Sequence, residues 1–161
     1  MTSKSSLLGL ALICAATTAH AAETGCSFEP RIPATRYEIN GGEVYDKEKN
    51  LTWQRCSLGQ QWKEGSGCVG ETREVSRAEA NKVSGNWRLP TKDELGTLLS
   101  SACLKSVNAE AFPGISLQHP NYWSSTETAP GLTWTVNLTS GGEFNAISSS
   151  SNAVKLVRSG R

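Results

Sequence analysis

The chain has 161 residues and is nearly neutral, with 16 Lys and Arg, 15 Asp and Glu, and a formal net charge of +1. This balance excludes an overall electrostatic attraction to nucleic acid or to an anionic membrane surface. If residues 1–21 are a leader, 161 less 21 leaves 140 residues, which is enough for one domain with its own hydrophobic core.

Residues 1–21 have the pattern of a signal peptide. Lys4 supplies a positive charge, Leu7–Ala16 is an apolar run, and Ala19–Ala21 has the small-x-small pattern of a cleavage site. The apolar run is shorter than the roughly 20 residues that cross a bilayer as a helix. The sequence therefore predicts an exported protein without a membrane span, in the periplasm or at the cell surface.

Four cysteines remain after the predicted leader, and an even number in an exported chain predicts two disulfides. Four cysteines allow three pairings. Cys56 and Cys68 flank a short loop and are the favoured local pair, which leaves Cys26 to join the N-terminal arm to Cys103. A cysteine metal site is the weaker alternative because the spacing contains no CxxC pair.

The residue pattern in the first half of the mature chain predicts an arm followed by three short strands. Residues 22–35 contain proline and lack periodicity, so the domain is expected to span residues 36–161. Alternating residues predict strands over Arg36–Ile39 and Glu43–Asp46, joined as a hairpin by a Gly-Gly turn. A third strand is expected over Leu51–Gln54, before a loop that holds Trp62.

Two capping boxes predict two helices. Ser76 with Glu79 begins a helix that Gly85 should end, and Thr91 with Glu94 begins a helix over 92–102. In the second helix three leucines recur at helical spacing and are expected in the core: Leu95, Leu98 and Leu99.

The second half has a different composition, because residues 106–154 contain no Lys or Arg and are rich in Ser, Thr, Asn and Gly. Four strands are expected, over Asn121–Ser125, Leu132–Leu138, Glu143–Ile147 and Ala153–Arg158, and the last is apolar enough to be central in a sheet. The order of elements predicts an α+β fold, with a mostly antiparallel sheet, two helices on one side, and long loops stapled by disulfides.

Four blocks of residues resemble the Lcl C-terminal domain family, which is named for the C-terminal domain of the Legionella collagen-like adhesin. The blocks together span residues 43–161, and their order makes the resemblance fairly specific. They are Asn50–Cys56 with Gly59, Trp62 and Cys68; Trp87–Thr91 with Glu94 and Leu95; Tyr122–Ser125; and Val154–Gly160.

This resemblance implies a C-type lectin-like fold, a group that also includes formylglycine-generating enzymes and phage receptor-binding proteins. In that group the two termini pair as strands and a long loop region displays the ligand surface. Here that region would be Phe112–Asn152. The resemblance implies a binding function, but a fold alone does not name a ligand.

Catalysis and metal binding have little support in the sequence. His119 is the only histidine after the predicted leader, which leaves little scope for a Ser-His or Cys-His pair. Calcium-dependent C-type lectins commonly use a Glu-Pro-Asn or Gln-Pro-Asp motif, for which the nearest string is His119-Pro120-Asn121. Calcium is therefore not favoured, because too few carboxylate oxygens converge. We expect a non-enzymatic protein without a cofactor.

The expected partner is a glycan or a protein, bound through polar and aromatic side chains without a metal. Trp53, Trp87 and Trp134 are expected in the core; Trp123 is also more typical of core, but it stays a candidate. The candidate ligand-binding residues are Asn121, Trp123, Glu127, Asn137, Asn145, Ser148, Ser149, Ser150 and Asn152. Their alternative role is a solvated loop rim.

Two further possibilities stay open. The adhesin of the family is associated with sulfated glycosaminoglycans, which need clustered basic residues. Such a site could use only the first half of the domain, at Lys47, Lys49, Arg55 and Lys63, and is less favoured. The alternative to adhesion is a periplasmic inhibitor or an envelope or pilus assembly factor that binds a protein partner.

Overall fold

The computed structural model describes residues 34–83, 85–99 and 107–161. The expected signal peptide and most of the N-terminal arm lie outside the described residues. The expected Cys26–Cys103 disulfide also falls outside them.

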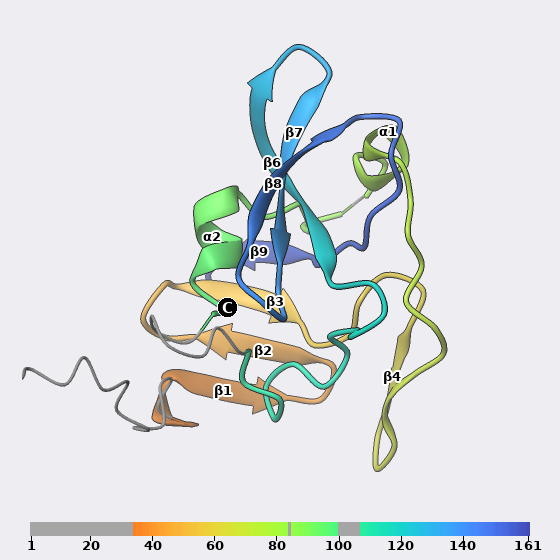
Figure 1. Cartoon of the computed structure of the whole chain (residues 1–161). Coiled ribbons are helices and arrows are strands. Elements are labelled where there is room, and N and C mark those ends of the chain that lie inside the picture. Colours follow the sequence, from red (N-terminus) through yellow and green to blue (C-terminus); the bar gives the residue numbers. More distant parts are fainter. Residues whose placement is uncertain (1–33, 84, 100–106) are drawn as a thin grey trace, which may run out of the picture.

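A four-stranded antiparallel sheet forms the lower part of the molecule in Figure 1. A single 3₁₀ turn, Ala34–Arg36, leads into β1 (Tyr37–Asn40), which forms the predicted hairpin with β2 (Glu43–Asp46). Gly41 takes a positive φ of 53° in the turn, a conformation that glycine adopts readily. The third strand, β3 (Leu51–Gln54), follows as predicted.

The last strand corrects a prediction. Only Val157–Ser159 forms a strand, β9, and it lies at the end of the sheet order β1-β2-β3-β9 instead of in the centre. The apolar residues before β9 are buried, and their backbone bonds to segments from both halves of the chain. Ala153 O accepts from Trp123 N, and Val154 O accepts from Leu58 N. The C-terminal strand therefore pairs with β3, and not with the first strand as the resemblance implied.

A second, three-stranded antiparallel sheet occupies much of the region that the resemblance predicted to be a long loop. Its strands are β6 (Asn121–Ala129), β7 (Leu132–Asn137) and β8 (Glu143–Ile147), in that order. The first two form the hairpin that projects at the top of Figure 1. The candidate residues therefore lie largely on strands.

The second sheet separates two hydrophobic clusters, because both of its faces carry large apolar side chains. Tyr122 and Trp123 are consecutive on β6, point to opposite faces, and are both 0% exposed. Tyr122 packs with Leu95 in one cluster, and Trp123 packs with Ala80 in the other. The two helices therefore cover opposite faces of this sheet, which corrects the expectation that they lie on one side.

Both predicted capping boxes are present, but the helices are shorter than expected. Helix α1 spans Arg77–Ala80 and does not extend to Gly85, and α2 spans Lys92–Gly96 and does not extend through Leu99. Gly96 has a low helix propensity, and the side chain of the following residue, Thr97, donates to the Glu94 carbonyl oxygen, which ends the helix there.

The predicted Cys56–Cys68 disulfide is present, with a Cα–Cα distance of 5.4 Å. It encloses a hairpin of β4 (Gln61–Lys63) and β5 (Gly67–Val69), where the sequence predicted only a loop. Gly114 packs directly against the bridge, since a Cβ atom there would lie 2.9 Å from Cys68 Sγ. Within the described part of the chain, no helix is long and apolar enough to cross a membrane.

Candidate binding surface

Trp123 cannot contact a ligand in this structure, which removes it from the candidate residues. Its side chain is fully buried, and its indole Nε1 donates a hydrogen bond of 2.8 Å to the backbone carbonyl oxygen of Val75. This bond satisfies the one polar group of the indole. Trp123 is therefore a structural residue that fixes β6 against the segment before α1.

Two candidate amides stabilise the second sheet. Asn137 Nδ2 donates to Asn121 Oδ1 across the β6–β7 pair, at 3.0 Å. Asn137 Oδ1 accepts from the backbone N–H groups of Thr139 and Ser140, at 3.0 and 2.8 Å. Such side-chain-to-backbone bonds are typical of an Asx turn, so these amides hold the β7–β8 turn in place.

The other candidates do not gather at one site. Ser148 Oγ donates to Gly131 O, Ser150 N donates to Ile147 O, and Asn152 is buried and exchanges backbone hydrogen bonds with Val75. Three candidates are exposed, Glu127, Asn145 and Ser149. Glu127 pairs with Thr133 and Asn145 with Trp134, and these two consecutive β7 residues point to opposite faces of the sheet.

Trp134 is partly exposed, which corrects its assignment to the core. Its neighbours on β7, Thr133 and Thr135, are buried at 0% and 2% exposure. The side chains of β7 therefore alternate between two faces as predicted, but at this end of the strand the buried face carries Thr133 and Thr135 and not Trp134. The second cluster covers that face around Trp123. On the tryptophan face Val136 packs in the first cluster with Leu95 of α2, whereas Trp134 has only the Lys92 side chain of α2 near its ring.

Four side chains form a mixed polar and aromatic group around this indole, which we name the Trp134 cluster: Lys92, Trp134, Glu143 and Asn145. Asn145 lies directly opposite Trp134 on β8, so the two share a face. The Lys92 ammonium lies 5.2 Å from the centre of the Trp134 ring and 3.0 Å from Glu143 Oε2. The cluster combines a ring, a cation, a carboxylate and an amide.

The electrostatics of the cluster hold Lys92 in place. The hydrogen bond to Glu143 raises the pKa of Lys92, with a further contribution from the charge of Asp93. An ammonium over an indole face also gains cation–π attraction. Lys92 therefore remains charged at neutral pH and offers donors beside the ring.

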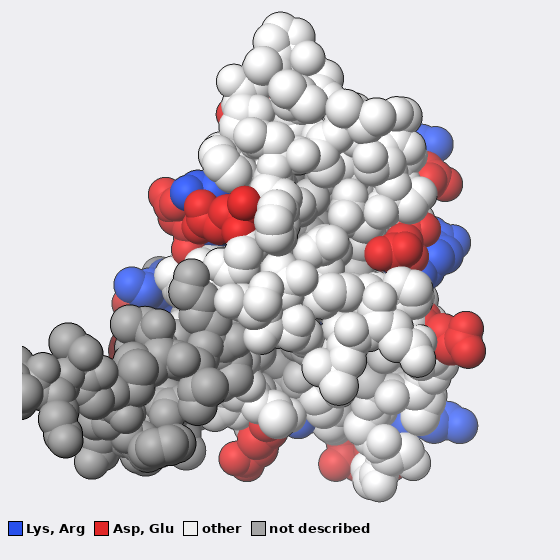
Figure 2. Space-filling view, viewed as in Figure 1, with Lys and Arg blue, Asp and Glu red and all other residues white. Residues whose placement is uncertain are grey.

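An apolar and uncharged surface continues from the cluster. Leu132 and Ile147 form the next cross-strand pair on the same face, and Ile147 is 56% exposed. The β6–β7 hairpin has no Lys or Arg, and its one charged residue, Glu127, pairs with Thr133, whose side chain points to the face opposite Trp134. Figure 2 shows mainly uncharged atoms over the projecting hairpin, whereas charges flank the molecule below it. This surface suits a ligand that is uncharged where it meets the hairpin.

The alternative basic site loses one of its four residues. Arg55 is buried, stacks on Trp62 with its guanidinium carbon 3.9 Å from the ring centre, and donates to the carbonyl oxygens of Gly41, Glu110 and Ala111. Its guanidinium therefore stabilises the fold. Lys47, Lys49 and Lys63 remain exposed.

Metal ligands do not converge in the described region, where no three His, Cys, Asp or Glu side chains lie close enough together to hold an ion. His119 Nδ1 lies 3.3 Å from Glu74 Oε2, in the loop before β6.

The family is decided by comparison with known sequences. The model of the Lcl C-terminal domain matches residues 42–158. The chain belongs to this family. No curated protein matches the chain at a significant level. The Lcl C-terminal domain is adhesin-associated, and this match confirms the resemblance that the four sequence blocks indicated.

The signature blocks of this Lcl C-terminal domain are structural in the fold. Arg88, in the second block, exchanges both backbone hydrogen bonds with Val157, in the fourth block. Trp53 is buried as predicted, and Leu89 of the second block is buried too. Trp87 is only partly buried, which corrects its assignment to the core, and the Arg158 guanidinium carbon lies 4.8 Å from the centre of its ring. The Trp134 cluster includes none of the signature residues, so sequence resemblance alone could not find it.

Proposed function

We propose that this chain is an exported, non-enzymatic binding module that recognises a glycan through the Trp134 cluster, in attachment at the cell envelope or surface. The observation that carries the proposal is a partly exposed indole with an amide, an ammonium and a carboxylate around it. A sugar ring can pack on an aromatic face while its hydroxyl groups donate to and accept from such side chains.

The family supports a binding role, and the composition supports the type of partner. The Lcl C-terminal domain is adhesin-associated. The hairpin beside the cluster has no Lys or Arg and one carboxylate, Glu127, which disfavours a sulfated polymer and favours a neutral glycan. Export rests on the sequence of residues 1–21, and the absence of catalysis is a proposal from the shortage of catalytic side chains.

A protein partner is the second candidate, as expected of an inhibitor or an envelope assembly factor. It is favoured by two exposed apolar side chains on the edge strand β8, Phe144 at 53% and Ile147 at 56%. Exposed edge strands can pair with a strand of another protein.

Glycan-array binding of the full chain, with and without a chelator, tests the first candidate. We expect binding to neutral glycans that survives the chelator and is lost in Trp134→Ala. Phe144→Ala is the matched control, because it removes an exposed aromatic side chain from the opposite face of the same sheet. Absence of binding to every glycan, or equal loss in both variants, would refute the proposal.

A further inference from the structure

The outer face of the four-stranded sheet carries a second group of polar side chains. One row crosses all four strands, because Glu38 pairs with Tyr45, Tyr45 with Thr52, and Thr52 with Arg158. Directly paired residues point to the same face of a sheet. The row therefore places a carboxylate, a phenol, a hydroxyl and a guanidinium side by side.

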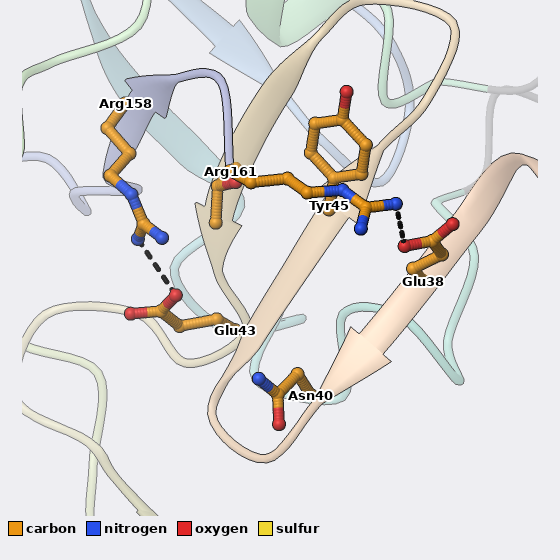
Figure 3. Close-up of a pocket in the computed structure, with 7 residues that line it drawn as sticks. Glu38, Asn40, Glu43, Tyr45, Arg158 and Arg161 are labelled. Carbon is orange, nitrogen blue, oxygen red and sulfur yellow. Dashed lines mark hydrogen bonds and ion pairs between the residues drawn. The ribbon is translucent and has the colours of Figure 1, made fainter.

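This row lines a pocket of about 180 Å³. Thr52 is 3% exposed and donates from its hydroxyl to the Gly160 carbonyl oxygen at 2.5 Å. Asn40 and Glu43 add a second cross-strand pair to the lining. Arg161 completes the lining, because its side chain extends over Tyr45 toward Glu38 (Figure 3).

The charged groups of the pocket are arranged as two ion pairs. Arg158 Nη1 lies 2.8 Å from Glu43 Oε2, and Arg161 Nη2 lies 2.5 Å from Glu38 Oε2. The Arg161 guanidinium carbon also lies 4.8 Å from the centre of the Tyr45 ring. Each pair is neutral overall, so the four charged side chains leave the pocket with no net charge to attract a free anion or cation.

We propose that this pocket binds one neutral sugar ring. The volume is below the range of about 300–1,000 Å³ typical of sites for drug-sized molecules, and suits a single small ring. Sugar hydroxyl groups both donate and accept, which matches carboxylates that accept beside guanidinium groups that donate. The Tyr45 ring supplies an apolar contact.

The pocket shares no residue with the Trp134 cluster, so this inference does not depend on the proposed function. It adds a second site, of the pocket type, on a different sheet. A ligand with a net charge would find no uncompensated partner charge in the pocket, because each carboxylate is already paired with a guanidinium group.

Amide chemical shifts of the isotope-labelled full chain test the proposal. The sugar probes are D-glucose, D-galactose and N-acetyl-D-glucosamine, with glycine as a zwitterionic probe and sodium sulfate as an anionic probe. We expect at least one sugar to shift the amide signals of Tyr45, Thr52 and Arg158, with a Kd in the millimolar range. Neither glycine nor sulfate should do so.

Glu43→Gln removes one charge while keeping the side-chain shape, and should weaken sugar binding roughly tenfold or more. Its spectrum also reports whether the variant is folded. Trp134→Ala is the matched control and should leave these shifts unchanged, which separates this site from the proposed function. Shifts caused only by glycine or sulfate, no shift with any sugar, or unchanged binding by Glu43→Gln would overturn the proposal.

Discussion

The Lys155 ammonium donates a hydrogen bond of 2.7 Å to the backbone carbonyl oxygen of Arg55, which lies 100 residues earlier in the chain. Lys155 is 0% exposed, and its nitrogen lies 5.2 Å from the centre of the Phe112 ring. Burial, together with the positive charge of Arg55, lowers the pKa of Lys155 to about 7. A buried amine therefore links the segment before β9 to the segment after β3.

We predict that Lys155 makes the free energy of unfolding depend on pH in the alkaline range. Its folded pKa is about 7, and an unfolded lysine has a pKa of about 10.4. Between these values the unfolded chain binds more protons, so the free energy of unfolding rises with pH by up to about 1.4 kcal/mol per unit. Below about 7 both states are protonated and this contribution to the slope disappears.

Chemical denaturation of wild type and Lys155→Met at several pH values between neutrality and pH of about 10 measures this slope. The difference in unfolding free energy between the two proteins should change with pH across this window. Lys82→Met, at an exposed position, is the control and should leave the slope as in wild type. Parallel curves for wild type and Lys155→Met would contradict the prediction.

The Cys56–Cys68 disulfide should contribute measurably to stability. It joins residues separated by 12 positions, and loops of this length correspond to about 2–4 kcal/mol. We expect Cys56→Ala with Cys68→Ala to lower the free energy of unfolding by that amount. Any bridge between Cys26 and Cys103 is kept in both proteins, so the comparison isolates this one. An unchanged unfolding midpoint would show that the bridge does not form.

Trp123→Phe should destabilise the fold without affecting ligand binding at the Trp134 cluster. The substitution removes the indole N–H that donates to Val75 O, although that oxygen keeps its hydrogen bond from Asn152 N, and it shortens a fully buried side chain. Together these losses should cost about 1–3 kcal/mol. Thermal denaturation measures the loss, and glycan binding below the melting temperature should equal that of wild type. Loss of binding by the folded variant would restore Trp123 as a ligand residue.

Glu94 should stabilise the start of α2 in a pH-dependent way. Its carboxylate accepts from both terminal nitrogens of Arg88 at 2.7 Å and from Thr91 N at 2.8 Å. Burial opposes the charge, but these hydrogen bonds, first that from Arg88, outweigh it and lower the pKa of Glu94. We expect Glu94→Gln to cost about 1–3 kcal/mol near neutral pH.

This contribution should be complete above the unfolded pKa of Glu, about 4.3, and lost as the pH falls through the lower folded value. Denaturation of wild type and Glu94→Gln at neutral and at acidic pH therefore should give a difference that shrinks in acid. The exposed Glu48→Gln is a control with a small expected effect. A constant difference at all pH values would refute the role of the charge.

Local features could be predicted from the sequence because short-range geometry determines them. Both capping boxes formed, since a hydroxyl and a carboxylate three residues apart satisfy the free N–H groups of a helix start. The β1–β2 hairpin and the bounds of β3 followed from alternation and a Gly-Gly turn. Cys56 and Cys68 paired because a short hairpin brings them together.

The helix ends and the placement of aromatic residues were harder to predict. Period-two alternation assigned Trp134 to the core together with Val136, and the two do share a face. Cover by α2 and the main core reaches Val136, which is 0% exposed, but leaves the indole partly open. Alternation specifies which side chains share a face, but the length of the covering element decides how many of them are buried.

The sequence by itself determined the family, the two helix starts, most of the strands and the local disulfide, because each depends on residues close together in the chain or on a fixed pattern. Only the tertiary structure decided that β9 pairs with β3, that Lys155 is buried beside Arg55, and that the outer face of the first sheet holds a pocket. These features join segments that are distant in sequence. A hydrophobic pattern indicates which residues are buried, but it does not indicate which segment of the chain covers them.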